Sequence, residues 1–284
     1  MRLDKKRDIR NNIIWILAVS AMILLITDIF TVIFVPEISE SHAYLYTFCA
    51  YMEFLTMWCS LLLVVLLFKK NRSILNTLKR NSGRNNYSTL FLGFLIGFLL
   101  NLFCALTALF NGNIHLEFQQ FHLLPVLGLC AAVAVQSFAE EFLCRGFLYQ
   151  RLLTATGKPF PAIFLNSLFF ALFHTFNDGV TMLALYDLLI TGIFFSMVVY
   201  YSDSLWMAAG IHTTWNFTQS ILLGLPNSGA VFPYSVMKLN KDLAASGFAY
   251  NTEFGLEGTI LSSVLMTVCC VGIYFWQRKN RAYA

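Results

Sequence analysis

Charged residues are scarce in this sequence: they make up 12% of the 284 residues, whereas 58% are hydrophobic. The apolar residues gather in runs of about twenty, the length at which a helix crosses a bilayer. This composition excludes a soluble globular protein, and the chain is too short to add a sizeable soluble domain to so many spans. We therefore predict one membrane domain over residues 1–284.

Other patterns are missing as well. The seven cysteines are an odd number and lie in or beside apolar runs, which argues against a disulfide framework and indicates small buried hydrophobes. No internal repeat of fixed period is visible. The basic residues cluster at the ends of apolar segments, where membrane proteins place them for orientation, so we expect no nucleic-acid partner.

Short polar stretches divide the apolar residues into about eight segments. This pattern predicts an all-α, polytopic transmembrane helical bundle. The predicted spans are 12–35, 43–68, 88–110, 123–150, 160–177, 182–201, 204–223 and 258–276. The first follows a basic N-terminus but is longer than an export signal needs, so we expect it to remain as a transmembrane helix.

An even number of spans leaves both termini on one side of the bilayer. If that side is the cytoplasm, 17 of the 19 basic residues lie inward, and only Lys238 and Lys241 lie outside. This asymmetry follows the positive-inside tendency. We predict cytoplasmic termini, a basic cytoplasmic linker over 69–87 that contacts anionic lipid, and an extracytoplasmic loop over 224–257. The expected location is a cell membrane, multi-pass, and a bacterial plasma membrane in particular.

The fourth span carries three charged side chains. A charge in a span costs about 2.5–3.5 kcal/mol, so each one present needs a structural or functional offset. Glu141 and Arg145 are four residues apart and share a helix face in the favourable order, acid before base. Their pairing leaves Glu140 without an obvious partner. The alternative is a helix end that carries ordinary charges among the lipid head groups.

The segment TGKPFP at 156–161 predicts the turn of a helical hairpin, because glycine suits a helix end and proline a helix start. Glu140 and His174 lie seventeen residues before and after Gly157, so an antiparallel hairpin places them at similar depth. The turn lies inward in the predicted orientation, which favours access from the cytoplasm. A lone membrane histidine is more often a packing or hydrogen-bonding residue.

The seventh span places His212 and Asn216 one helical turn apart on one face. The two side chains could together hold a developing oxyanion. The alternative is interhelical hydrogen bonding, which is also what we expect of Asn101, Asn166 and Asp187.

Three motifs occur in a fixed order on these segments. Glu140–Arg145 fits EExxxR, Phe170–His174 fits FxxxH and His212–Asn216 fits HxxxN. Together they resemble the CPBP family, also called Abi, which contains the type II CAAX prenyl endopeptidases and bacterial relatives in bacteriocin processing and self-immunity. The motifs cover about 137–217, within a predicted catalytic core over 120–223.

The resemblance implies an intramembrane endopeptidase that acts on a membrane-associated peptide or protein, either a bacteriocin or pheromone precursor or a CAAX-type substrate. In it, Glu140 helped by His174 would activate a water molecule. His212 and Asn216 would stabilise the tetrahedral oxyanion. The supporting residues would be Glu141, Arg145 and Phe170.

Two alternatives concern the mechanism and the class of protein. We expect no cofactor, but zinc held by Glu140, His174 and His212 is the rival, although no HExxH spacing is present. A non-catalytic self-immunity or scaffold membrane protein could retain the same motifs. A secondary transporter could use Asp28 and Glu53 to share a proton, but paired inverted segments are not visible.

Overall fold

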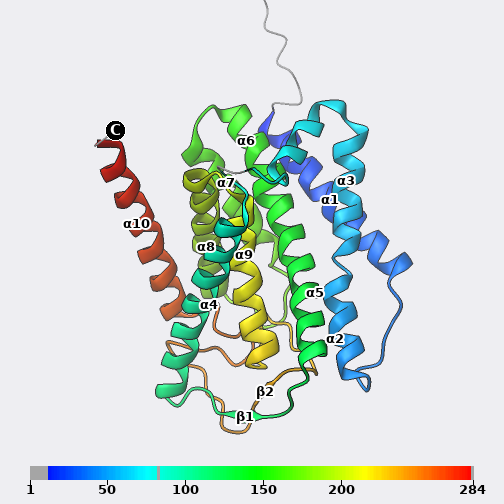
Figure 1. Cartoon of the computed structure of the whole chain (residues 1–284), viewed down its shortest axis with the longest axis vertical. Helices are drawn as coiled ribbons and strands as arrows, with labels where there is room; N and C mark the ends of the chain where they lie inside the picture. The colour runs from blue at the N-terminus through cyan, green and yellow to red at the C-terminus, as the bar shows by residue number, and fades with distance from the viewer. Residues whose placement is uncertain (1–11, 82–83, 283–284) are drawn as a thin grey trace, which may run out of the picture.

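The computed structural model describes residues 12–81 and 84–282 as a bundle of helices (Figure 1). The helices are α1 (Ile13–Phe34), α2 (Ala43–Met52), α3 (Leu55–Leu67), α4 (Tyr87–Phe110), α5 (Leu123–Glu141), α6 (Tyr149–Thr156), α7 (Pro159–Phe173), α8 (Met182–Ser202), α9 (Leu205–Asn216) and α10 (Ile260–Ala282). Shorter elements are a 3₁₀ helix η2 (Lys69–Thr77), π-helices η3 (Phe142–Leu148) and η4 (Phe217–Leu222), and strands β1 (Leu116–Phe118) and β2 (Met237–Leu239). The predicted all-α bundle is confirmed.

Each of the eight predicted spans coincides, to within a few residues at most ends, with one or more of these helices. By length and composition, six helical stretches of the described chain can cross a membrane: Ile13–Phe34, Ala43–Leu67, Tyr87–Phe110, Leu123–Thr156, Met182–Ser202 and Ile260–Gln277. Helix α7 is apolar but shorter, and α9 has 12 residues before it continues into η4. The basic N-terminal segment 1–11 lies outside the described residues.

The predicted hairpin turn is present. Helix α6 ends at Thr156, and Gly157 follows it with φ of 65° in the left-handed region, where a glycine avoids the strain of a side chain. Helix α7 then begins at Pro159, whose fixed φ suits the first helical position. The turn brings α7 back along the long α5–η3–α6 helix.

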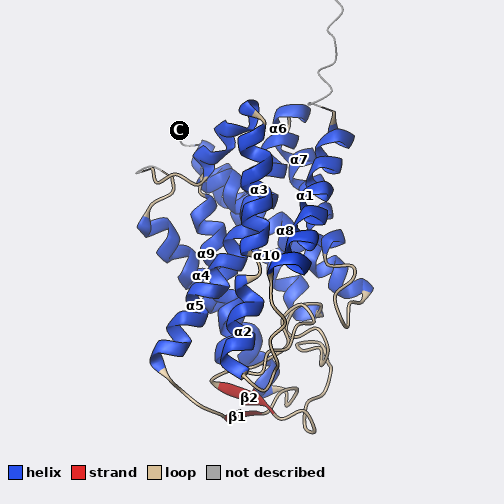
Figure 2. Cartoon of the chain, turned by 90° about the vertical axis from the view of Figure 1, so that its right-hand side faces the viewer, coloured by secondary structure: helices blue, strands red, loops and turns tan. Residues whose placement is uncertain are grey.

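The start of α1, helix α6 and the end of α10 lie at one end of the bundle, and β1, β2 and the loop 224–257 lie at the other (Figure 1). The two strands form a small antiparallel sheet, which the sequence did not predict (Figure 2). It pairs Glu117 with Lys238 and so attaches the segment before α5 to the loop. The loop is thereby fixed over one end of the bundle.

Helix α9 lies close to α4 because glycines line their contact. A Cβ atom added to Gly93 or Gly97 of α4 would collide with the carbonyl oxygens of Met207 and Ile211. Small residues allow this backbone approach in membrane helices. The contact fixes the depth and rotation of α9, which carries His212 and Asn216.

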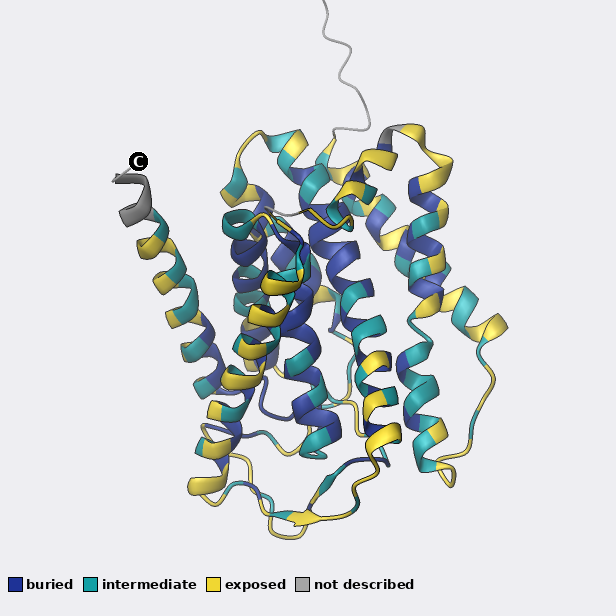
Figure 3. Cartoon of the chain, in the orientation of Figure 1, coloured by how far each residue is buried: buried dark blue, intermediate teal, exposed yellow. Residues whose placement is uncertain are grey.

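The outside of the bundle is apolar, as expected for a protein surrounded by lipid, and its mainly hydrophobic core also holds a number of buried polar and charged residues. Exposed apolar side chains cover α1 and α10, whereas buried residues concentrate on the central helices (Figure 3). Three buried polar residues make the hydrogen bonds between segments that we predicted. Asn101 donates to Gln219, Asn166 donates to Ser196, and Asp187 accepts from the Ser263 hydroxyl and the Gly258 amide.

Candidate active site

Helices α5, α7 and α9 contribute the motif residues to one cavity of about 380 Å³. The motif side chains that line it are Glu140, Phe170, His174, His212 and Asn216. A π-helical stretch, η3, begins directly after Glu141, and such stretches are frequent at functional sites. The four predicted catalytic residues thus face one hollow in the bundle.

The predicted pair of Glu141 and Arg145 is present and fully buried. The Arg145 Nη1 lies 2.9 Å from Glu141 Oε1, and both side chains are 0% exposed. The guanidinium also donates from Nη2 to the Gly192 carbonyl at 3.0 Å, and it lies over the rings of Phe170 and Phe195. Phe170, the first residue of the FxxxH motif, therefore supports this pair through a cation–π contact.

His212 contacts both acidic residues of the first motif. Its Nδ1 lies 3.1 Å from Glu141 Oε1, and because a carboxylate only accepts, Nδ1 carries the hydrogen. The other ring nitrogen, Nε2, lies 3.8 Å from Glu140 Oε2. Glu141 therefore accepts from Arg145 and His212 with the same oxygen and holds the imidazole in one orientation.

His174 follows the last residue of α7 and is 8% exposed. Its Nδ1 donates to the Phe170 carbonyl at 2.8 Å, which leaves Nε2 as the nitrogen available to a ligand. In the described part of the chain, no hydrogen bond joins His174 to Glu140. The structure thus brings Glu140 and His212 together, with His174 in the wall of the same cavity.

Sequence reasoning missed Gln136, which joins two of the predicted residues. Its Nε2 donates to Glu140 Oε1 at 2.6 Å, and its Oε1 accepts from Asn216 Nδ2 at 3.0 Å and from the Ser137 hydroxyl at 3.1 Å. Gln136 lies one helical turn before Glu140, so the spacing of four could have revealed it.

Glu257 was also missed, and it is a second buried carboxylate in the wall of the cavity. It accepts hydrogen bonds from Trp215 Nε1 at 2.8 Å and from the Ser228 amide at 2.7 Å. Burial raises the pKa of Glu257 above the usual carboxyl value, and these hydrogen bonds oppose the shift. Because Trp215 lies inside the HxxxN motif, Glu257 attaches the loop to α9.

The end of the bundle at which the cavity lies differs from our expectation. Besides the helices, the loop 224–257 lines the cavity through Asn227, Ser228, Ala230, Phe232 and Glu257. No residue of the hairpin turn 156–161 lines it. We expected access from the side of the Gly157 turn, but the cavity adjoins the opposite end of the bundle.

Two further observations concern possible binding groups. Among the described residues, no three His, Cys, Asp or Glu side chains are grouped so that they could hold a metal ion, so the three rival zinc ligands are not gathered at one point.

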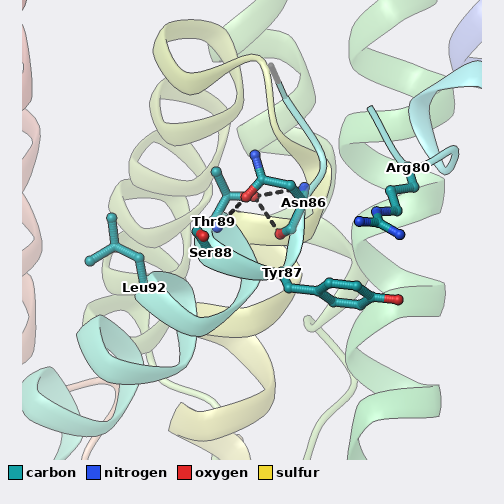
Figure 4. Close-up of a pocket in the computed structure, with 6 residues that line it drawn as sticks. All are labelled: Arg80, Asn86, Tyr87, Ser88, Thr89 and Leu92. Carbon is teal, nitrogen blue, oxygen red and sulfur yellow. Dashed lines mark hydrogen bonds between the residues drawn. The ribbon is translucent and has the colours of Figure 1, made fainter. Parts of the chain in front are cut away.

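A separate hollow of about 720 Å³ lies at the start of α4 (Figure 4). It contains the capping box of Asn86 and Thr89, and none of the predicted catalytic residues lines it.

The chain matches one known family. Residues 117–218, which contain all three motifs, match the family described as "Type II CAAX prenyl endopeptidase Rce1-like". The predicted resemblance is thus confirmed for this part of the chain, and the match supports a CAAX-type intramembrane endopeptidase in general. No curated protein and no solved structure matches the chain. The predicted link to bacteriocin self-immunity gains no support from this match.

Proposed function

We propose that this protein hydrolyses a peptide bond with Glu140 as the general base and with His212 and Asn216 as the oxyanion site. The observation that carries this proposal is the 3.8 Å contact of His212 Nε2 with Glu140 Oε2 at a cavity that His174 and Asn216 also line. A base and hydrogen-bond donors at one cavity are the minimum equipment for hydrolysis of an amide.

In the proposed reaction, Glu140 Oε2 removes a proton from a water molecule as its oxygen bonds to the substrate carbonyl carbon. The C=O bond becomes a single bond, and the resulting oxyanion accepts hydrogen bonds from His212 and Asn216. The C–N bond then breaks, and the proton held by Glu140 passes to the departing amine. Nε2 of His174, on the cavity wall, is the candidate to assist this proton transfer.

The hydrogen bond to Glu141 defines what His212 must do. Since Nδ1–H already donates to Glu141, His212 can donate to an oxyanion only through Nε2. It must therefore carry protons on both nitrogens at that step. The pair of Glu141 and Arg145 holds this ring in place, which agrees with the bracing role that the resemblance implies.

The substrate side follows from the place of the cavity. If the basic residues define the cytoplasmic side, the loop 224–257 and the cavity beside it face outward. A membrane-associated peptide or protein presented on the outer surface then suits the site, and an exported peptide precursor is one such substrate. Attachment of an impermeant thiol reagent to a Ser228→Cys variant of a cysteine-free protein, in intact cells, tests this side.

Purified protein in lipid vesicles, mixed with a library of quenched fluorescent peptides, tests the activity. General-base catalysis supplies about 10²–10⁴-fold in rate, so Glu140→Gln should lose cleavage by that factor or more. His212→Ala should lose about 10²–10³-fold. Glu117→Gln, on the exposed strand β1, is the matched control and should cleave normally. Cleavage by Glu140→Gln at the wild-type rate would exclude the mechanism, and full biological complementation by it would indicate a non-catalytic scaffold.

A further inference from the structure

The helix pair α2–α3 is interrupted beside the cavity. Glu53 and Phe54 lie between the end of α2 and the start of α3, and both line the catalytic cavity. The Glu53 side chain is half-buried, and within the described residues its carboxylate has no hydrogen bond and no ion pair. A carboxylate that is removed from water without a hydrogen bond or a cation is unfavourable. The described residues provide Glu53 with neither.

Glu53 also lines two neighbouring hollows. One, of about 270 Å³, lies against α1 and includes Asp28, and the other, of about 590 Å³, includes Glu37 and Glu40. The three hollows share Glu53 as a lining residue, so they lie next to one another between α1, α2 and the catalytic cavity. Asp28 and Glu53 make no hydrogen bond with each other in the structure, so the shared proton considered above has no support.

Among the described residues, the lysine, arginine and carboxylate side chains that line these three hollows have a single sign of charge. The acidic residues are Asp28, Glu37, Glu40, Glu53, Glu140 and Glu257. No lysine or arginine in the part of the chain that the structure describes lines any of the three hollows. A cleft lined by one sign of charge within low-dielectric walls concentrates ligands of the opposite sign.

A second, independent observation comes from Tyr51, two residues before Glu53. Tyr51 lines the catalytic cavity and is only 4% exposed, and its hydroxyl, which lies beside the Ser220 hydroxyl, makes no well-formed hydrogen bond with the described residues. The Tyr46 ring lines the cavity too. Burying a hydroxyl whose hydrogen bond is poorly formed is unfavourable, so this group can gain from a ligand. Aromatic rings and a carboxylate that line one cavity suit an ammonium or guanidinium group.

We propose that Glu53 and Tyr51 form a substrate subsite for a cationic group of the peptide, a Lys or Arg side chain or a free amino terminus near the scissile bond. The subsite sets the substrate preference of the proposed peptidase, so it rests on that proposed function. Glu53 pairs with the cation, and the Tyr51 hydroxyl accepts a hydrogen bond from it. Glu53 thereby selects the substrate but takes no part in bond cleavage.

The test compares peptides that differ in one charge. A peptide cleaved by the wild-type protein is remade with norleucine in place of its lysine, which keeps the aliphatic chain and removes the cation. The wild type should prefer the lysine peptide in kcat/KM by about 10- to 100-fold, the factor expected for a hydrogen bond to a charged group. Glu53→Gln should lower that preference to about 2-fold or less, chiefly through KM. Acetylation of the peptide's amino terminus tells whether the terminal amine or the side chain is bound.

Three variants sharpen the comparison. Glu53→Lys should reverse the preference and favour a peptide with glutamate at the lysine position. Tyr51→Phe should reduce the preference partially, whereas Tyr149→Phe, another buried tyrosine with an unpartnered hydroxyl but away from the cavity, should not. Glu253→Gln removes an exposed carboxylate from the same loop that lines the cavity and should leave the preference intact.

The subsite is overturned if Glu53→Gln cleaves both peptides with the wild-type preference, or if Glu253→Gln reduces that preference equally. Failure of the proposed function has a different signature, because then the wild type and Glu140→Gln would cleave neither peptide. In that case, a labelled lysine-containing peptide of the library and its norleucine counterpart are used instead, and their binding to wild type and Glu53→Gln, measured by fluorescence anisotropy, decides whether Glu53 selects a cation.

Discussion

Gln136 and Glu140 are joined by a 2.6 Å hydrogen bond from Nε2 to Oε1, the shortest link between the proposed base and its surroundings. Because an ionised carboxylate only accepts, the Gln136 amide must turn its NH₂ group toward Glu140 and its oxygen toward Asn216. One glutamine therefore sets the orientation of the proposed base and of a proposed oxyanion donor together. It leaves Glu140 Oε2, the oxygen in contact with His212, free to accept a proton from water in the proposed reaction.

We predict that Gln136→Leu lowers kcat by about 10- to 100-fold with little change in KM, since a base displaced by even 1 Å loses rate on this scale. Gln136→Glu, which faces Glu140 with a second carboxylate, should also move the acidic limb of the pH–rate profile upward. The matched control is Gln219→Leu, which removes another buried amide that bonds Asn101 and Glu257 but not Glu140. An equal upward shift of the acidic limb in Gln136→Glu and in Gln219→Leu would contradict this role of Gln136.

The buried pair of Glu141 and Arg145 makes a second prediction, on stability. Arg145→Met leaves the Glu141 carboxylate uncompensated, which should cost about 3–5 kcal/mol in the free energy of unfolding. Unfolding titrations in mixed micelles measure it. Arg84→Met breaks an exposed pair with Asp203, whose side chains are 60% and 61% exposed, and should cost about 1 kcal/mol or less. The double variant Glu141→Gln/Arg145→Met should regain part of the loss, and equal losses in both arginine variants would refute the argument.

The sequence predicted those parts of the fold and site that depend on local spacing. The apolar segments, the turn at Gly157 and the pair of Glu141 and Arg145 all follow from helix length, backbone preference or a spacing of four residues. The matching depth of Glu140 and His174 followed from counting residues along a hairpin, and both indeed line one cavity.

Features that depend on contacts between distant segments were not predictable in this way. Glu257 reaches the site because the loop folds back over α9, and Glu53 because α2 and α3 are interrupted beside α5. The end of the bundle that the cavity adjoins is decided by the same loop. Periodicity describes each helix separately and carries no information on contacts between distant segments. The access side was therefore predicted from the turn at Gly157, and the contribution of the loop 224–257 to the cavity was not predicted.

The mechanism without metal gives a third prediction. The rival zinc ligands Glu140, His174 and His212 are not gathered as a metal site among the described residues, and Gln136 and Glu141 already hold two of them. Cleavage should survive exhaustive dialysis against a chelator, and added zinc should not increase it. If chelation abolished cleavage and added zinc alone restored it, the metal rather than Glu140 would activate the water molecule.

The approach of α4 to α9 gives the last prediction. A methyl group at Gly97 would meet the Ile211 carbonyl and the Thr214 hydroxyl, which itself donates to the Phe94 carbonyl of α4 at 2.9 Å. Gly97→Ala must therefore push α9 away and displace His212 and Asn216 from Glu140, at an overpacking cost of about 1–3 kcal/mol. We expect kcat to fall with the unfolding free energy. Gly272→Ala, on α10 with open space around it, should change neither, and a fully active Gly97→Ala protein would show that the oxyanion side chains do not depend on this helix contact.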